Sequence, residues 1–292
     1  MRPRIADLPP VIPAVKLDLP PHAGRNSEHR ILRDPGPTHR VEVIDASDIP
    51  HPAAGPGDAP YRLFRAVPLG GVPEGGWPVL YMLDGNAAFD FLSAALLATV
   101  PGLVVIGIGH ATDQQFDRIG RARDLGFPGQ GTGSRGGTPP GGGAPAFIAL
   151  LLNTLRQRAE AGLPIDGNRR GIWGHSLAGL FVLRLMLGQP DSFARYASIS
   201  PSLWLGGDEL WRMLDQAPPQ GPLRLYLASG NREKRTGSDG PEPTDAPAAF
   251  HALLARLRRC EGIGMSHQIY DGARHIASLP TSLGPVLRFA AV

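Results

Sequence analysis

The clearest chemical signal in this chain is a serine set between small residues, in the run Gly-His-Ser-Leu-Ala-Gly at positions 174–179. A short apolar segment precedes this run, and an apolar helical pattern follows it. A nucleophilic serine on a sharp strand-to-helix turn needs small residues two positions away on either side, and Gly174 and Ala178 meet that need. The pattern therefore predicts that Ser176 is a nucleophile exposed above a sheet, with a helix N-terminus directed at the developing oxyanion.

A serine nucleophile needs a general base, and in this arrangement the histidine comes last along the chain. Of the nine histidines, His275 lies just after the last predicted strand, so we predict that it is the base. The acid is expected after the strand predicted at 223–227, where Glu233 is the first carboxylate. The alternatives that stay open are a dyad without an acid, and the later carboxylates Asp239, Glu242 and Asp245.

Acyl transfer also needs donors for the oxyanion of the tetrahedral intermediate. One donor is expected to be the backbone N–H of Leu177, the residue after the nucleophile. The second is expected from the turn Leu-Asp-Gly-Asn at 83–86, after the third predicted strand. Asn86 is the predicted donor there, and Gly85 gives the backbone freedom to turn.

Alternating strands and helices are predicted to position these groups. Strands are expected at 39–44, 61–67, 78–83, 103–108, 170–173, 196–199, 223–227 and 267–270. Helices are expected at 87–99, 145–161, 177–187, 247–259 and from 281 onward. This order predicts a single-domain α/β-hydrolase with a mostly parallel, roughly eight-stranded sheet covered by helices on both faces. Two long loops, 126–143 and 229–246, interrupt the alternation.

Composition narrows the class of protein. The chain has 292 residues, and we divide it into a proline-rich N-terminal arm at 1–30 and a hydrolase domain at 31–292. A net charge of +3 gives no argument for nucleic acid, and one cysteine excludes an intramolecular disulfide. Neither a metal site nor a cofactor is expected, because no His, Asp or Glu cluster has ligand spacing. Without a signal peptide or membrane-length run, we expect a cytoplasmic or periplasmic protein.

Four motifs in order resemble the siderophore esterases of the family named "Putative esterase", within the α/β-hydrolase superfamily. They are the elbow region at 165–183, YMLDGN at 81–86, the segment 116–128, and SPSLW at 200–204. The resemblance extends from about residue 60 to the C-terminus. The chain departs from the common pattern at Leu177 and Ala178, where members usually carry Tyr or Met and then Gly. It also has Arg274 where members usually have glycine before the histidine.

The resemblance implies an enzyme that opens the trilactone of enterobactin-like catecholate siderophores for iron release. Iron would then arrive with the substrate, and Arg121 would contact the anionic catecholates. The alternative for Arg121 is a structural salt bridge to Asp117 or Asp124. Two other functions remain open: a general carboxylesterase or acyltransferase acting on small acyl esters, and a non-catalytic binding protein built on a hydrolase scaffold.

Overall fold

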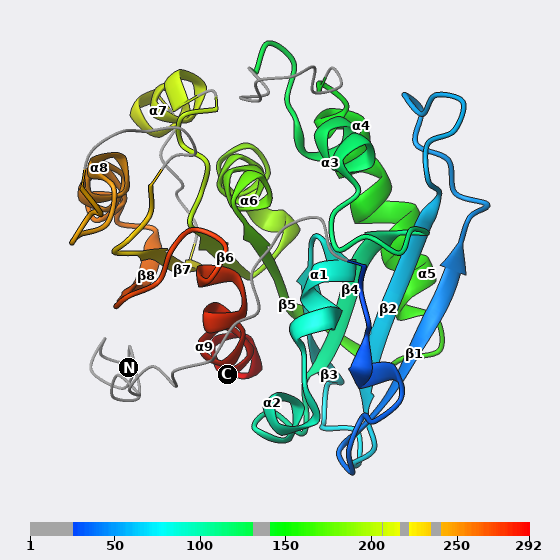
Figure 1. The fold of residues 1–292 in the computed structure, drawn as a ribbon. Coiled ribbons are helices and arrows are strands. Elements are labelled where there is room, and N and C mark those ends of the chain that lie inside the picture. The colour runs from blue at the N-terminus through cyan, green and yellow to red at the C-terminus, as the bar shows by residue number, and fades with distance from the viewer. Residues whose placement is uncertain (1–25, 131–140, 206, 217–221, 235–240) are drawn as a thin grey trace.

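A single eight-stranded sheet organises the molecule (Figure 1). The computed structural model describes residues 26–130, 141–205, 207–216, 222–234 and 241–292. The spatial order of the strands is β1-β2-β4-β3-β5-β6-β7-β8. Their bounds are β1 His39–Ala46, β2 Tyr61–Pro68, β3 Trp77–Met82, β4 Val104–His110, β5 Ile165–His175, β6 Arg195–Ile199, β7 Leu223–Gly230 and β8 Ile263–Tyr270.

The sheet is parallel except at one edge, where β2 pairs antiparallel with both β1 and β4. The predicted α/β class and mostly parallel eight-stranded sheet are therefore confirmed. Central strands β3 and β6 are buried along their whole length, as the unbroken apolar run of β3 predicts. Because parallel strands end at the same edge, the loops that follow β3, β5, β6, β7 and β8 gather there.

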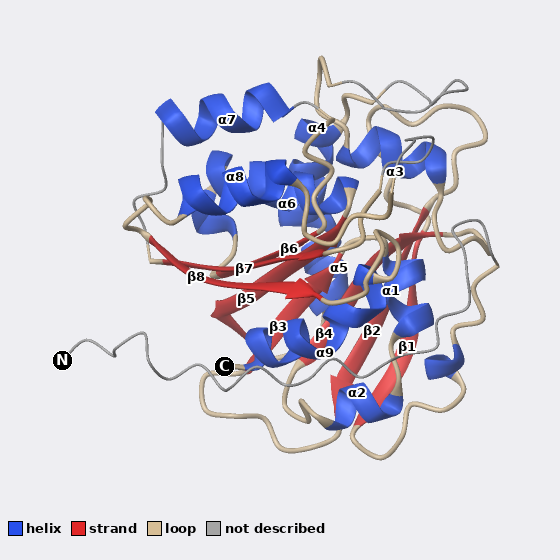
Figure 2. Ribbon diagram, turned by 60° about the vertical axis from the view of Figure 1, so that its left-hand side comes forward, coloured by secondary structure: helices blue, strands red, loops and turns tan. Residues whose placement is uncertain are grey.

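Helices cover both faces of the sheet, with α1, α2 and α9 on one face and α3 to α8 on the other (Figure 2). Each face has its own apolar core, and successive strand residues alternate between them. On β5, Ile172 packs in the larger core and Trp173 in the core beneath α9. The helix bounds are α1 Gly85–Phe91, α2 Ala94–Ala98, α3 Arg118–Leu125, α4 Ala144–Leu150, α5 Arg156–Glu160, α6 Leu177–Gly188, α7 Gly207–Gln216, α8 Ala248–Leu257 and α9 Ser278–Ala291.

The helix predictions were less accurate than the strand predictions. The helix predicted at 87–99 is two helices, because Leu92 adopts an extended conformation and Ser93 caps α2 by accepting from the N–H of Leu96. Helix α3 was missed, although Asp117 caps it by accepting from two backbone N–H groups. Helix α7 was also missed. The helix predicted at 145–161 is α4 and α5, joined by a π-helical segment at Leu151–Leu155.

The two segments that break the alternation, and the predicted arm, are only partly described. Residues 1–25 of the arm, 131–140 of the glycine-rich loop and 235–240 of the charged loop lie outside the described residues. At the start of the described chain, Asn26 forms a β-bridge with Gln114, and the backbone N–H of His29 donates to Asp90. Within the described ranges, no helix is both long and apolar enough to cross a membrane.

Candidate active site

The turn at Ser176 has the geometry of a nucleophile elbow. β5 ends at His175, Ser176 has φ 63° and ψ −117°, and α6 begins at Leu177. A non-glycine residue rarely adopts this conformation, which marks a strained position. A Cβ added to Gly174 would lie 2.3 Å from the carbonyl oxygen of Ala178 and 2.9 Å from its Cβ. The close approach explains the predicted need for small residues on both sides of the serine.

Three side chains from three separate loops meet at this elbow. His275, between β8 and α9, places Nε2 2.8 Å from the Oγ of Ser176. Its Nδ1 lies 2.8 Å from Oε2 of Glu233, which follows β7. The structure therefore brings together the predicted nucleophile, the predicted base and the leading acid candidate in triad geometry. Of the other acid candidates, Asp245 pairs with His251 and Glu242 with Arg274, while Asp239 lies outside the described residues.

Glu233 is held by donors on both carboxylate oxygens. Oε2 faces His275, while Oε1 accepts from the hydroxyls of Ser200 and Ser229 and from the N–H of Gly230. Burial acts to raise the pKa of this carboxyl. The hydrogen bond and charge of His275, with the hydrogen bonds from Ser200 and Gly230, outweigh burial and lower the pKa below its ordinary value. Glu233 is therefore a carboxylate that can only accept hydrogen bonds.

The histidine of the elbow motif, His175, contacts the main chain of the predicted base. His175 is 1% exposed, and its Nε2 donates to the backbone carbonyl of His275 at 2.8 Å. Burial, followed by the neighbouring His275, lowers the pKa of His175 to about 3. His175 is thus neutral at ordinary pH, and its ring holds the main chain of His275 in place. Sequence reasoning assigned it no role, because one buried ring nitrogen leaves no sequence pattern.

The SPSLW segment after β6 also reaches the site, which sequence reasoning did not specify. Ser200 has φ 45° and donates to Glu233, as described above. Ser202 places its Oγ 3.0 Å from the Oγ of Ser176. Trp204 is 45% exposed, and its ring centroid lies 5.8 Å from that of His275. The only sequence signal for these residues was the motif match.

The two predicted oxyanion donors both lie in the first turn of a helix. Leu177 is the first residue of α6, and Asn86 is the second residue of α1. Backbone N–H groups in a first turn have no partner within the helix. The side chain of Asn86 is fixed, because its Nδ2 donates to three carbonyls (His110, Thr112 and Gln114) and its Oδ1 accepts from the N–H of His110. The turn after β3 is therefore rigidly tied to the segment after β4.

Arg121 joins the turn after β3 to the elbow. Its Nε contacts Oδ1 of Asp84 at 2.7 Å, and its Nη2 donates to the carbonyl of His175 at 3.2 Å. The alternative of a structural salt bridge named Asp117 or Asp124 as the partner, and both were wrong. Asp117 is occupied in capping α3, and Asp124 pairs with His110 and Arg123. The arginine side chain remains 18% exposed.

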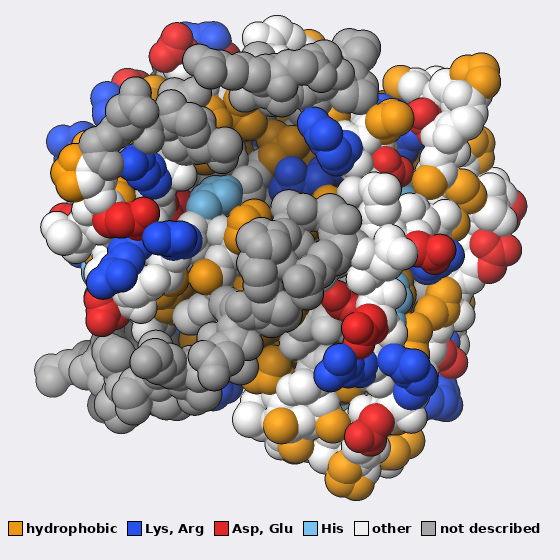
Figure 3. All heavy atoms as spheres, viewed as in Figure 1, with side chains coloured by type: hydrophobic (Ala, Val, Ile, Leu, Met, Phe, Trp, Pro, Cys, Tyr) orange, Lys and Arg blue, Asp and Glu red, His pale blue; other side chains and the backbone are white. Residues whose placement is uncertain are grey.

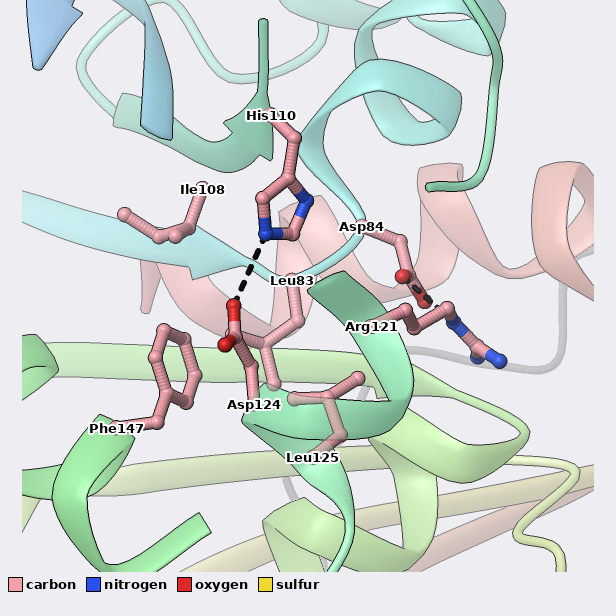
Figure 4. Close-up of a pocket in the computed structure, with 8 residues that line it drawn as sticks. All are labelled: Leu83, Asp84, Ile108, His110, Arg121, Asp124, Leu125 and Phe147. Carbon is pink, nitrogen blue, oxygen red and sulfur yellow. Dashed lines mark hydrogen bonds and ion pairs between the residues drawn. The ribbon is translucent and has the colours of Figure 1, made fainter. Parts of the chain in front are cut away.

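Figure 4 shows a small pocket beside this ion pair. Two polar pairs line it, Arg121 with Asp84 and His110 with Asp124, and apolar side chains of the larger core close the rest, namely Leu83, Ile108, Leu125 and Phe147. The guanidinium of Arg121 points away from the His110–Asp124 pair. Across the described part of the chain, no three His, Cys, Asp or Glu side chains are grouped so that they could hold a metal ion.

Fold and site together define a serine hydrolase of the α/β-hydrolase class. The family model described as "Putative esterase" matches residues 66–278. The chain belongs to this esterase family.

Relatives with known activities agree with this assignment. The chain is 30% identical to the ferri-bacillibactin esterase BesA of Bacillus subtilis over 79% of its own length and 84% of the relative. It is 39% identical to the apo-salmochelin esterase of Escherichia coli, over 58% of this chain and 55% of that protein. The solved structure of the enterobactin and salmochelin hydrolase IroE covers 90% of this chain and 99% of its own, with 28% identity and a TM-score of 0.71.

Proposed function

We propose that this enzyme hydrolyses the ester bonds of a catecholate trilactone siderophore, with Ser176, His275 and Glu233 as its catalytic triad. The observation that carries the chemistry is the continuous path from Ser176 Oγ to His275 Nε2 and from His275 Nδ1 to Glu233, with 2.8 Å at each contact. Glu233 fixes the tautomer in which Nε2 is free to take the serine proton. The substrate class comes from relatives named as siderophore esterases.

In the first half of the reaction, Ser176 Oγ attacks an ester carbonyl while its proton passes to His275. The carbonyl electrons move to the oxyanion, which the N–H groups of Leu177 and Asn86 are positioned to receive in this proposal. The intermediate collapses, and His275 returns the proton to the departing alcohol. Water then repeats the sequence on the acyl-serine, releasing the acid and regenerating Ser176.

The surroundings of the triad suit an aromatic, anionic substrate. The ring of Trp204, which is 45% exposed and lies beside His275, adds an aromatic surface to the site. Exposed Arg274 directly precedes His275 and pairs with Glu242, and several basic side chains lie on the face of the molecule drawn in Figure 3. Arg121 contributes a further cation, although its pairing with Asp84 offsets part of that charge.

A direct comparison of substrates tests this proposal. The purified protein is assayed with ferric enterobactin, iron-free enterobactin and p-nitrophenyl butyrate, and kcat/KM is measured for each. We expect an enterobactin form to be the best substrate. Much faster cleavage of p-nitrophenyl butyrate than of both enterobactin forms would instead favour a general carboxylesterase or an acyltransferase.

A further inference from the structure

A buried hydroxyl that is not part of the triad contacts the Oγ of Ser176. Ser202 is 1% exposed, and its Oγ lies 3.0 Å from the Oγ of Ser176. Among the described residues, Ser202 Oγ has no other hydrogen-bond partner. A buried hydroxyl whose only partner is the attacking atom is well placed to act on the reaction.

The direction of this hydrogen bond follows from counting protons. The carboxylate of Glu233 only accepts, so the neutral ring of His275 carries its proton on Nδ1 and accepts at Nε2. The single hydroxyl proton of Ser176 is then donated to Nε2. No proton of Ser176 remains for Ser202, so Ser202 must donate its own hydroxyl proton to Ser176 Oγ.

We propose that Ser202 is a fourth catalytic residue, which stabilises negative charge on Ser176 Oγ. This inference rests on Ser176 acting as the nucleophile. As Ser176 loses its proton to His275, charge grows on Oγ before the new bond to carbon is complete, and the hydrogen bond from Ser202 strengthens. In deacylation the carbon–oxygen bond breaks, its electron pair returns to Oγ, and His275 gives back the proton. Ser202 stabilises the departing oxygen at that moment.

The backbone holds Ser202 in place independently of its hydroxyl. Its N–H donates to the carbonyl of Ser176 at 3.1 Å, and its own carbonyl accepts from the N–H of Leu205 at 2.9 Å. Removing the hydroxyl therefore leaves the loop tethered to the elbow. Because the backbone of Ser202 holds the loop and only its hydroxyl contacts Ser176 Oγ, a variant without the hydroxyl measures the catalytic role of the side chain.

The expected size of the effect follows from the change in charge on the acceptor. Hydrogen bonds to an ionised oxygen are roughly twice as strong as those between neutral groups. The extra strength is present only while Oγ carries charge, so it lowers the barrier to both chemical steps. We expect loss of the donor to slow acylation and deacylation by about 5–15-fold each.

The test compares Ser202→Ala with wild type in pre-steady-state assays on p-nitrophenyl butyrate, where the burst rate reports acylation and the steady rate reports deacylation. The rate at which a fluorophosphonate labels Ser176 gives an independent measure. Ser202→Cys keeps the side-chain size with a weak donor and provides the same test if the alanine variant does not fold. Ser282→Ala is the matched control, because Ser282 is also buried but contacts Trp173 and not the triad.

We expect slower burst, steady-state and labelling rates in the Ser202 variants, with KM and melting temperature near those of wild type and of the control. Unchanged rates in a folded Ser202 variant would overturn the proposal, as would a loss confined to KM. Failure of Ser176 as the nucleophile is a distinct result, because the wild-type protein would then not be labelled at Ser176 at all.

Discussion

Replacing Glu233 with glutamine is expected to damage catalysis more than removing the side chain altogether. Oε1 of Glu233 accepts from three donors, namely Ser200, Ser229 and the N–H of Gly230. An amide NH₂ cannot face three donors, so the glutamine oxygen must take that position and its NH₂ must face Nδ1 of His275. The ring would then accept at Nδ1 and carry its proton on Nε2, where it can no longer remove the proton of Ser176.

The magnitude follows from that change of tautomer. Neutralising the acid of a serine-protease triad in this way is known to lower kcat by about 10⁴, and we expect a comparable loss for Glu233→Gln. Glu233→Ala leaves Nδ1 without a partner, so both tautomers of His275 remain accessible and the loss of kcat is expected to be smaller than for Glu233→Gln. The assay is kcat on p-nitrophenyl butyrate for both variants, with melting temperatures to confirm folding. A loss below about threefold, or an alanine variant as impaired as the glutamine variant, would refute this reasoning.

Two further predictions concern arginines. Arg121→Ala should lower kcat/KM for ferric enterobactin about tenfold more than for p-nitrophenyl butyrate, because only ferric enterobactin is anionic. Equal losses on both substrates, with a lower melting temperature, would show that Arg121 has only the structural role of joining Asp84 to the elbow. Arg195→Met should raise the melting temperature at pH 7, because Arg195 is 7% exposed and its Nε has no hydrogen-bond partner. Burial, together with Arg224 and Arg169, lowers the pKa of Arg195 from 12.5 to about 10, equivalent to about 3 kcal/mol against the charged form. This penalty on the folded state is present at neutral pH and declines as pH rises from about 10 to 12.5. The increase in melting temperature of Arg195→Met over wild type should therefore become smaller across that pH range. The exposed Arg40→Met is its control, and no gain over that control at pH 7 would contradict the argument.

Much of this fold is predictable because its strands are short apolar runs between turn residues. All eight strands of the described residues were predicted, because a run as short as β3 that is bounded by turn residues is typical of a strand buried on both faces. The helices were harder, because short helices such as α3 depend on one cap, here Asp117, rather than on a long periodic pattern. The break at Leu92 likewise comes from local capping by Ser93.

The candidate site also has a part that the sequence predicts and a part that only the fold reveals. The elbow has a local sequence pattern, and chain order identifies His275 as the base candidate, so both are visible before the structure. The partner of Arg121 is not, because Asp84 lies 37 positions away and only the approach of two loops joins them. The contact of Ser202 with Ser176 spans 26 positions and depends on the parallel pairing of β5 with β6. Such contacts are set by the sheet, and no spacing along the chain reveals them.

The most direct test of the central claim is the turnover of ferric enterobactin by Ser176→Ala, measured as release of linear products alongside wild type. The account predicts that wild type opens the trilactone and that the variant loses about 10³–10⁶-fold in kcat while still binding the substrate, because only transition-state chemistry is removed. Near-normal turnover by the variant would contradict it.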